Sequence, residues 1–276
     1  MIEFIHALRT TPFMQYALIA GLLASVSCGV VGTYVVTKKI SMVSGGIAHT
    51  ILGGVGLVCF LNKVYGMNIP PMYGALVVAL LAAIVIGLVK IYGEHDADTI
   101  IAAMWSVGMA VGVIFIALTP GYNNDLMSYL FGNILMVTKH DLYLLVLLDV
   151  FVIIVGVTLY HKFCAICFDE DFARVKGINV TFYYLLLLCL TAITIVTLIQ
   201  VVGLILVIAL LTIPAAIAKQ YSNSMWKMML WAVILGVFFT LSGLVLSYGP
   251  DLPSGAVIII IASLSFVIST VYKKII

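Results

Sequence analysis

The chain has 276 residues, of which 64% are hydrophobic and 9% are charged, with a net charge of +2. Soluble domains are about 45–50% apolar and about 25% charged, so this composition indicates a protein embedded in lipid. It excludes a sizeable soluble domain. The sequence also lacks the G-x-x-x-x-G-K-[ST] phosphate loop, which excludes a self-contained ATPase of that class.

Nine apolar runs are long enough to cross a membrane as helices, for which about 20 residues suffice. They fall at 15–37, 42–62, 71–92, 99–119, 142–161, 180–199, 201–218, 226–248 and 255–272. A helix satisfies every backbone group internally, and no alternating β-barrel pattern occurs, so we predict an all-α polytopic bundle. The sixth run ends at 199 and the seventh begins at 201, with only the stretch 200–203 at their boundary. The count is therefore eight or nine, with one segment re-entrant if it is eight.

The basic residues predict an orientation with the N-terminus outside and the C-terminus inside. In that arrangement the outer side holds three basic residues and the inner segments hold ten, which is the asymmetry expected of membrane proteins. The outer three are Arg9, Lys63 and Lys139; the inner ten are Lys38, Lys39, Lys90, Lys162, Arg174, Lys176, Lys219, Lys227, Lys273 and Lys274.

Two connections are longer than the others. The outer one contains an apolar helical pattern, 122–138, that is too short to span and is predicted to be a re-entrant or surface helix. The inner one, 162–179, is the most charged stretch of the chain. Its acidic residues from Asp169 favour a helix start and Gly177 a helix stop, which indicates a short docking helix. A solvated linker is the alternative.

Ionisable residues inside a bilayer are functional candidates. His49 lies near the midplane in a stretch of small residues, and a neutral imidazole is a common metal ligand. Asp149 lies seven residues into the fifth span and is a candidate for a cation path. The alternative for both is a hydrogen bond to a neighbouring helix. In the inner acidic loop, Asp96 and Asp98 are placed to catch an emerging cation, although a helix N-cap is the simpler role for Asp98.

Six segments, taken in order, resemble the permease subunit of zinc/manganese-type metal ABC importers. They are TKKISMVSGGIAHTILGGVGL (37–57), DADTIIAAMWSVGMAVGVIF (96–115), SYLFGNILMVTKHDL (128–142), FDEDFARVKGI (168–178), VVGLILVIALLTIPAAIA (201–218) and LPSGAVIIIIA (252–262). The resemblance implies a single permease domain over 1–276, with a fold similar to that of cobalamin and siderophore importers. It also implies a multi-pass protein of a prokaryotic cytoplasmic membrane.

The resemblance further implies the partners. They are two cytoplasmic ATPase subunits, an extracytoplasmic metal-binding protein and a second permease copy, in a homodimer or a heterodimer, with lipid around them and no nucleic acid. The coupling segment corresponds to 164–178. Its implied ATPase contacts are Asp169, Glu170, Phe172, Ala173, Arg174 and Gly177.

One position departs from the family pattern. Most relatives carry Asp four residues before the histidine, and here that residue is Gly45. Carboxylates suit manganese, whereas imidazole suits zinc, so the departure favours zinc as the transported ion, with manganese and iron as the alternatives. No covalently bound cofactor is expected.

We therefore expect alternating access, with His49 and Asp149 holding the ion briefly and ATP hydrolysis supplied by a partner. No H-E-x-x-H or G-x-S-x-G motif supports an intramembrane enzyme. The alternatives are an ABC permease for a larger metal chelate, an ATP-independent channel or secondary transporter, and a structural scaffold.

Overall fold

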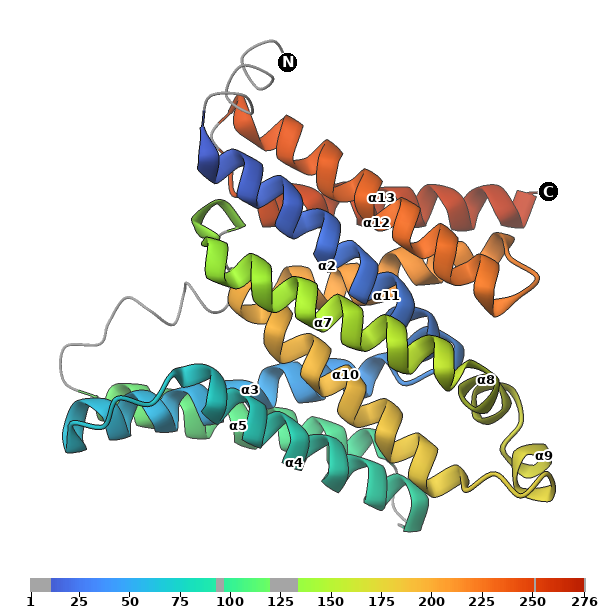
Figure 1. Cartoon of the computed structure of the whole chain (residues 1–276), viewed down its shortest axis with the longest axis horizontal. Helices are drawn as coiled ribbons and strands as arrows, with labels where there is room; N and C mark the ends of the chain where they lie inside the picture. Colours follow the sequence, from blue (N-terminus) through green and yellow to red (C-terminus); the bar gives the residue numbers. More distant parts are fainter. Residues whose placement is uncertain (1–10, 93–96, 120–133, 251, 276) are drawn as a thin grey trace. The chain divides into compact units, whose positions relative to one another are not determined.

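The computed structural model describes residues 11–92, 97–119, 134–250 and 252–275 (Figure 1). Within these ranges the regular structure is helical, and nine helices are long and apolar enough to span a membrane. They are α2 (Pro12–Thr37), α3 (Ser41–Tyr65), α4 (Pro71–Tyr92), α5 (Ala97–Ala117), α7 (Lys139–Thr158), α10 (Val180–Val202), α11 (Leu204–Tyr221), α12 (Met225–Tyr248) and α13 (Ser254–Ile275). The prediction of an all-α, multi-pass membrane protein is confirmed.

The break between the sixth and seventh apolar runs is a single residue, Gly203. Its backbone has φ 87° and ψ 159°, a conformation that is essentially restricted to glycine. The helices on either side, α10 and α11, have 23 and 18 residues. Both are long enough to cross a bilayer, so the described residues support nine spans over eight.

Two predicted features fall largely outside the described residues. Of the predicted outer helix 122–138, the structure describes one turn of 3-10 helix, η1 (Ile134–Met136). Asp96 of the acidic loop also lies outside the described ranges, whereas Asp98 is exposed in the first turn of α5.

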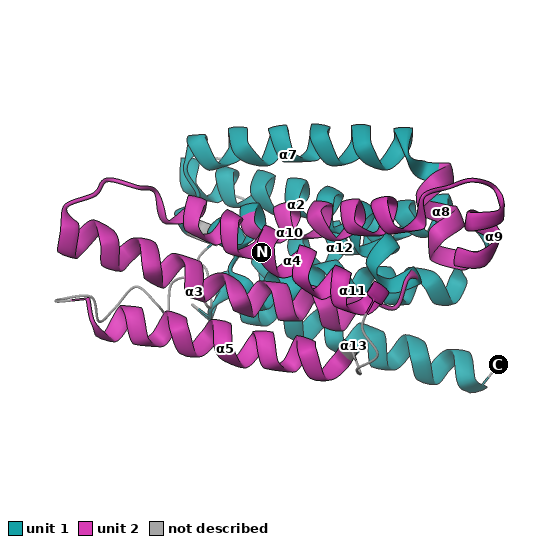
Figure 2. Ribbon diagram, turned by 90° about the horizontal axis from the view of Figure 1, so that it is seen from below, with its two compact units in different colours: residues 1–37, 128–160, 197–276 teal, residues 38–127, 161–196 magenta. Residues whose placement is uncertain are grey.

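The chain divides into two compact units, each of which is considered by itself (Figure 2). Unit 1 consists of residues 1–37, 128–160 and 197–276, and unit 2 of residues 38–127 and 161–196. The helix α10 therefore contributes its last residues to unit 1 and the rest to unit 2.

In unit 1, α2 packs against α7, α11 and α12. The backbones of α2 and α11 approach so closely that a Cβ atom on Gly32 would collide with the carbonyl oxygen of Leu211. The Tyr34 hydroxyl donates a hydrogen bond of 2.9 Å to the carbonyl oxygen of Gly156 in α7. Small residues that let backbones approach, together with interhelical hydrogen bonds, are the usual basis of helix association in lipid.

In unit 2, α3 packs against both α4 and α5 through glycines. Gly54 of α3 faces Gly74 of α4 so closely that a Cβ on either residue would collide with the carbonyl oxygen of the other. A Cβ on Gly56 would lie 2.7 Å from the carbonyl oxygen of Gly112 in α5. The three helices therefore fit together backbone to backbone, with α3 contacting both of the others.

Candidate translocation and coupling sites

His49 lies on α3 and its ring stacks on the indole of Trp105 in α5. The ring centroids are 4.0 Å apart and the planes differ by 7°. The imidazole Nδ1 is enclosed and has no hydrogen-bond partner among the described residues. The indole Nε1–H donates in turn to the Met109 sulfur at 3.0 Å. The stack therefore holds the imidazole in one orientation and leaves one ring nitrogen without a protein partner.

Thr50, the residue after His49, forms hydrogen bonds within α3 and to α5. The Thr50 hydroxyl donates to the carbonyl oxygens of Gly46 at 2.7 Å and of Met104 at 3.2 Å, which links α3 to α5 at the level of the stack. One helical turn before His49, a Cβ built on Gly45 would meet no atom within 4 Å. The helix thus has an open position beside the imidazole.

Asp149 is buried on α7, where its Oδ1 accepts a hydrogen bond from the Ser27 hydroxyl of α2. Its second oxygen, Oδ2, is enclosed and has no partner among the described residues. The sequence indicated Asp149 but not its partner. The structural alternative for Asp149, a hydrogen bond to a neighbouring helix, is therefore present. This hydrogen bond does not by itself exclude a role in transport.

The described residues contain no group of three or more His, Cys, Asp or Glu side chains that could hold a metal ion. His49 belongs to unit 2 and Asp149 to unit 1, so each is considered separately. Within either unit, the described part of the chain therefore offers no closed metal site of three or more such ligands.

The predicted docking segment consists of two short helices, α8 (Tyr160–Phe168) and α9 (Glu170–Val175). Asp169 lies between them and caps α9, since its carboxylate accepts from the backbone N–H of Phe172 at 3.0 Å. After α9 the chain turns at Gly177, with φ 76°. The predicted helix start and stop are therefore at the predicted residues.

The exposure of α8 and α9 changes the predicted contact set. Ala173 is completely buried within the chain, at 0% exposure, so its side chain packs inward. Position along a short helix does not reveal which side faces inward, and the implied ATPase contact of Ala173 stays a prediction. Three apolar side chains are instead exposed: Phe168 at 71%, Phe172 at 53% and Val175 at 87%. Sequence reasoning had identified only Phe172 of these.

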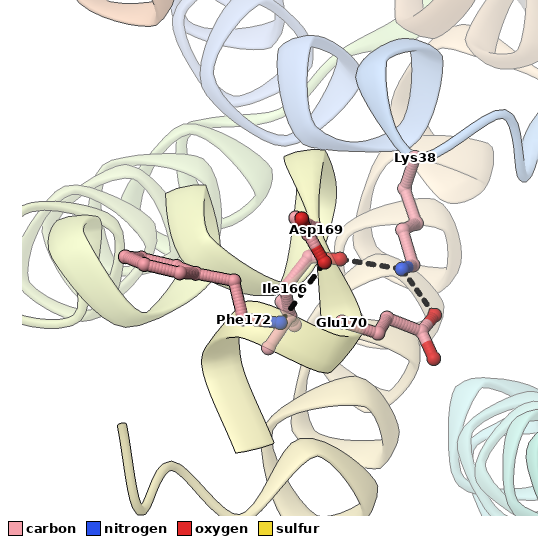
Figure 3. Close-up of polar contacts among 5 residues, drawn as sticks. All are labelled: Lys38, Ile166, Asp169, Glu170 and Phe172. Carbon is pink, nitrogen blue, oxygen red and sulfur yellow. Dashed lines mark hydrogen bonds and ion pairs between the residues drawn. The ribbon is translucent and has the colours of Figure 1, made fainter. Parts of the chain in front are cut away.

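A lysine at the start of unit 2 holds the two short helices. The Lys38 ammonium donates to the carbonyl oxygen of Ile166 in α8 and forms an ion pair with the Glu170 carboxylate of α9 (Figure 3). The family resemblance implies an ATPase contact for Glu170, and the sequence gives no indication of its lysine partner. Asp169, Arg174 and Gly177 are exposed, as a contact surface requires.

Comparison with known proteins identifies the family. A sequence model of the ABC 3 transport family matches residues 10–273. The chain belongs to that family. The resemblance carried by the six sequence segments is confirmed.

Several relatives of the chain are named as membrane proteins of metal transport systems. The chain is 43% identical over 256 residues to a probable metal transport system membrane protein of Chlamydia pneumoniae, covering 93% of this chain and 87% of the relative. It is 35% identical over 267 residues to the manganese import system permease protein ScaB of Streptococcus parasanguinis, covering 97% and 93%. Its structure is similar to PsaBC of Streptococcus pneumoniae in complex with Fab, with a TM-score of 0.85 and 32% identity over 98% of this chain and 95% of that chain. This ABC 3 chain is thus a metal ABC transporter permease.

Proposed function

We propose that the chain is the transmembrane subunit of an importer that carries a divalent transition-metal ion across a prokaryotic cytoplasmic membrane. Separate ATPase subunits drive transport, and an extracytoplasmic metal-binding protein supplies the ion. The family and the names of the relatives support this class of function. The observation that carries the proposal is the His49 imidazole, a metal ligand in a spanning helix whose Nδ1 has no partner in the described structure.

The ion that this arrangement favours is zinc. The relative from Streptococcus parasanguinis is named for manganese, which prefers carboxylate and water oxygens. Here the turn before His49 carries Gly45, which adds no oxygen ligand, and the imidazole is packed against the aromatic ring of Trp105, itself in contact with the Met109 thioether. An imidazole-centred donor set suits zinc better than manganese.

The sparse set of ligands is consistent with transport. An ion that must leave again needs binding that is favourable but weak, whereas a closed tetrahedral site would retain it. A second copy of the chain would bring a second His49, which makes a permease dimer the natural assembly. Asp149 is the further candidate along the path, with its unpartnered Oδ2 available to a cation.

The exposed face of α8 and α9 is the surface that we assign to the ATPase. Phe168, Phe172 and Val175 are exposed at the connection predicted to be cytoplasmic, and large exposed apolar residues outside the lipid mark interaction sites. The predicted sidedness gains support within unit 2. Lys38 and Lys90, from two different predicted inner connections, both lie over the Tyr184 ring, at 5.9 and 5.7 Å from its centroid.

The test is reconstitution in vesicles with the cognate ATPase and metal-binding protein. Metal-loaded binding protein should stimulate ATP hydrolysis and drive zinc accumulation in preference to manganese. His49→Ala should reduce uptake while leaving the complex assembled.

Three results would refute parts of the proposal. Metal flux from the chain alone, without ATP, would make it a channel or secondary transporter. Preferential accumulation of manganese would leave the importer standing and overturn the choice of ion. Uptake only of a metal chelate would indicate the larger-cargo alternative.

A further inference from the structure

The break between α8 and α9 is bridged by one half-buried lysine, Lys38. The Lys38 side chain is 9% exposed, and its ammonium binds the Ile166 carbonyl oxygen in the last turn of α8 and the Glu170 carboxylate at the first residue of α9 (Figure 3). Glu170 is 44% exposed. All three residues belong to unit 2, so the arrangement lies within one compact body.

Each contact suits the helix end at which it lies. The last carbonyls of a helix have no intrahelical partner and carry partial negative charge, so a cation is favourable at Ile166. Glu170 lies in the first turn of α9, where a carboxylate is favourable. One ammonium therefore joins the end of α8 to the start of α9 and fixes the angle between the two helices.

The same lysine begins the connection into α3. Lys39 has a positive φ of 61°, Ile40 is buried, and α3 starts at Ser41. His49 follows eight residues later on that helix, about 12 Å along its axis. The turn over Lys39 and Ile40 therefore joins the lysine to α3, and from Ser41 an unbroken helix runs to the candidate ion ligand.

We propose that the Lys38–Glu170 pair is the joint through which movement of α9 is transmitted to α3 and the His49 position. The pair acts as a positioning element, because neither residue is a candidate ion ligand and the Lys38 ammonium is already bound to Ile166 and Glu170. This inference rests on the proposed function, in which α9 contacts the ATPase and His49 holds the ion. Breaking the pair separates ATP hydrolysis from metal movement.

The experiment uses the complete transporter with its ATPase and metal-binding protein in vesicles. Three variants are compared with the native chain: Lys38→Met, Glu170→Gln and the charge exchange Lys38→Glu/Glu170→Lys. Matched controls are Lys39→Met, the exposed lysine next in sequence, and Asp171→Asn, the exposed acid next to Glu170. Assembly, ATP hydrolysis and zinc uptake are measured for each.

In the single variants, zinc transported per ATP should fall by about 5-fold or more, the lower end of coupling between two sites, while assembly and hydrolysis persist. The charge exchange should restore part of the ratio, and the controls should match the native chain. If Lys38→Met fails to assemble, Glu170→Gln and the exchange decide, because Glu170 is partly exposed and its loss leaves Lys38 bound to Ile166.

Unchanged transport per ATP in both single variants overturns the joint. The joint is also overturned if assembly, hydrolysis and uptake are lost together and the charge exchange restores none of them. That is the result expected of a pair that only stabilises the fold. ATP hydrolysis by the native transporter is measured before any variant is compared. If metal-loaded binding protein does not stimulate it, the proposed function itself is refuted.

Discussion

The substitution Gly45→Asp tests whether α3 holds the transported ion. Gly45 precedes His49 by four residues, so a new carboxylate and the imidazole would lie on the same helix face. The space around the helix allows it, because a Cβ on Gly45 meets no atom within 4 Å. The two side chains would then offer one oxygen and one nitrogen ligand to the same ion.

The expected gain follows from this geometry. Cβ atoms four residues apart on a helix are about 5–6 Å apart, a separation that two ligands can bridge around one ion. Groups that merely orient a metal ligand change metal affinity by about 10- to 100-fold, so a direct ligand should contribute at least about 10-fold. Because carboxylate suits manganese, manganese affinity should rise more than zinc affinity. Tighter binding should also slow release and lower the rate of uptake.

The assay is equilibrium dialysis of the purified chain against zinc or manganese, followed by measurement of bound metal. Gly45→Asn is the matched control, since its side chain has the same size and no charge. Equal binding by the Asp and Asn variants would refute the reasoning. So would a gain in Gly45→Asp that survives a second substitution, His49→Ala, because His49 is the ligand that the carboxylate is meant to join.

Three further substitutions test packing and coupling. Gly54→Ala should lower the free energy of unfolding in detergent by about 1–3 kcal/mol, because its Cβ would collide with the Gly74 backbone; an unchanged melting temperature would contradict this contact. Phe172→Ala should leave stability within about 0.5 kcal/mol, since the side chain is exposed, yet weaken copurification of the ATPase; undiminished copurification would exclude Phe172 from the interface. Asp149→Ala should destabilise the chain by about 1–3 kcal/mol by leaving the Ser27 hydroxyl without its acceptor, whereas Asp149→Asn should retain most stability; equal losses would show that the hydrogen bond is not the cause.

The spans could be predicted from the sequence because length and apolar content determine what crosses a bilayer. A local signal also sufficed at Asp169, where the helix cap depends on the residue itself. The acidic start of α9 was visible for the same reason. At Gly203 the sequence left the count at eight or nine, and the glycine-only backbone conformation of the structure marks the break.

Partners on other helices could not be predicted. Ser27 is one of several small polar residues in an apolar run, and nothing local to it indicates that it bonds to Asp149. The stack of His49 on Trp105 likewise depends on how α3 and α5 are packed. The spacing of Trp105 and Met109, four residues apart, could have indicated their contact on one helix face, because such pairs are neighbours.

The packing of α3 bears on how a small displacement at the proposed lysine joint would reach His49, the proposed ion ligand. Gly54 is in backbone contact with Gly74 of α4, and Thr50 is hydrogen-bonded to the Met104 carbonyl of α5, so α3 cannot slide along either neighbour without losing these contacts. Packed elements of this kind move as rigid bodies rather than deform continuously. The three helices would therefore shift together, and the imidazole would keep its stack on Trp105 throughout the cycle. Release of the ion would then come from a change in what faces His49, and not from a change in the orientation of the ring.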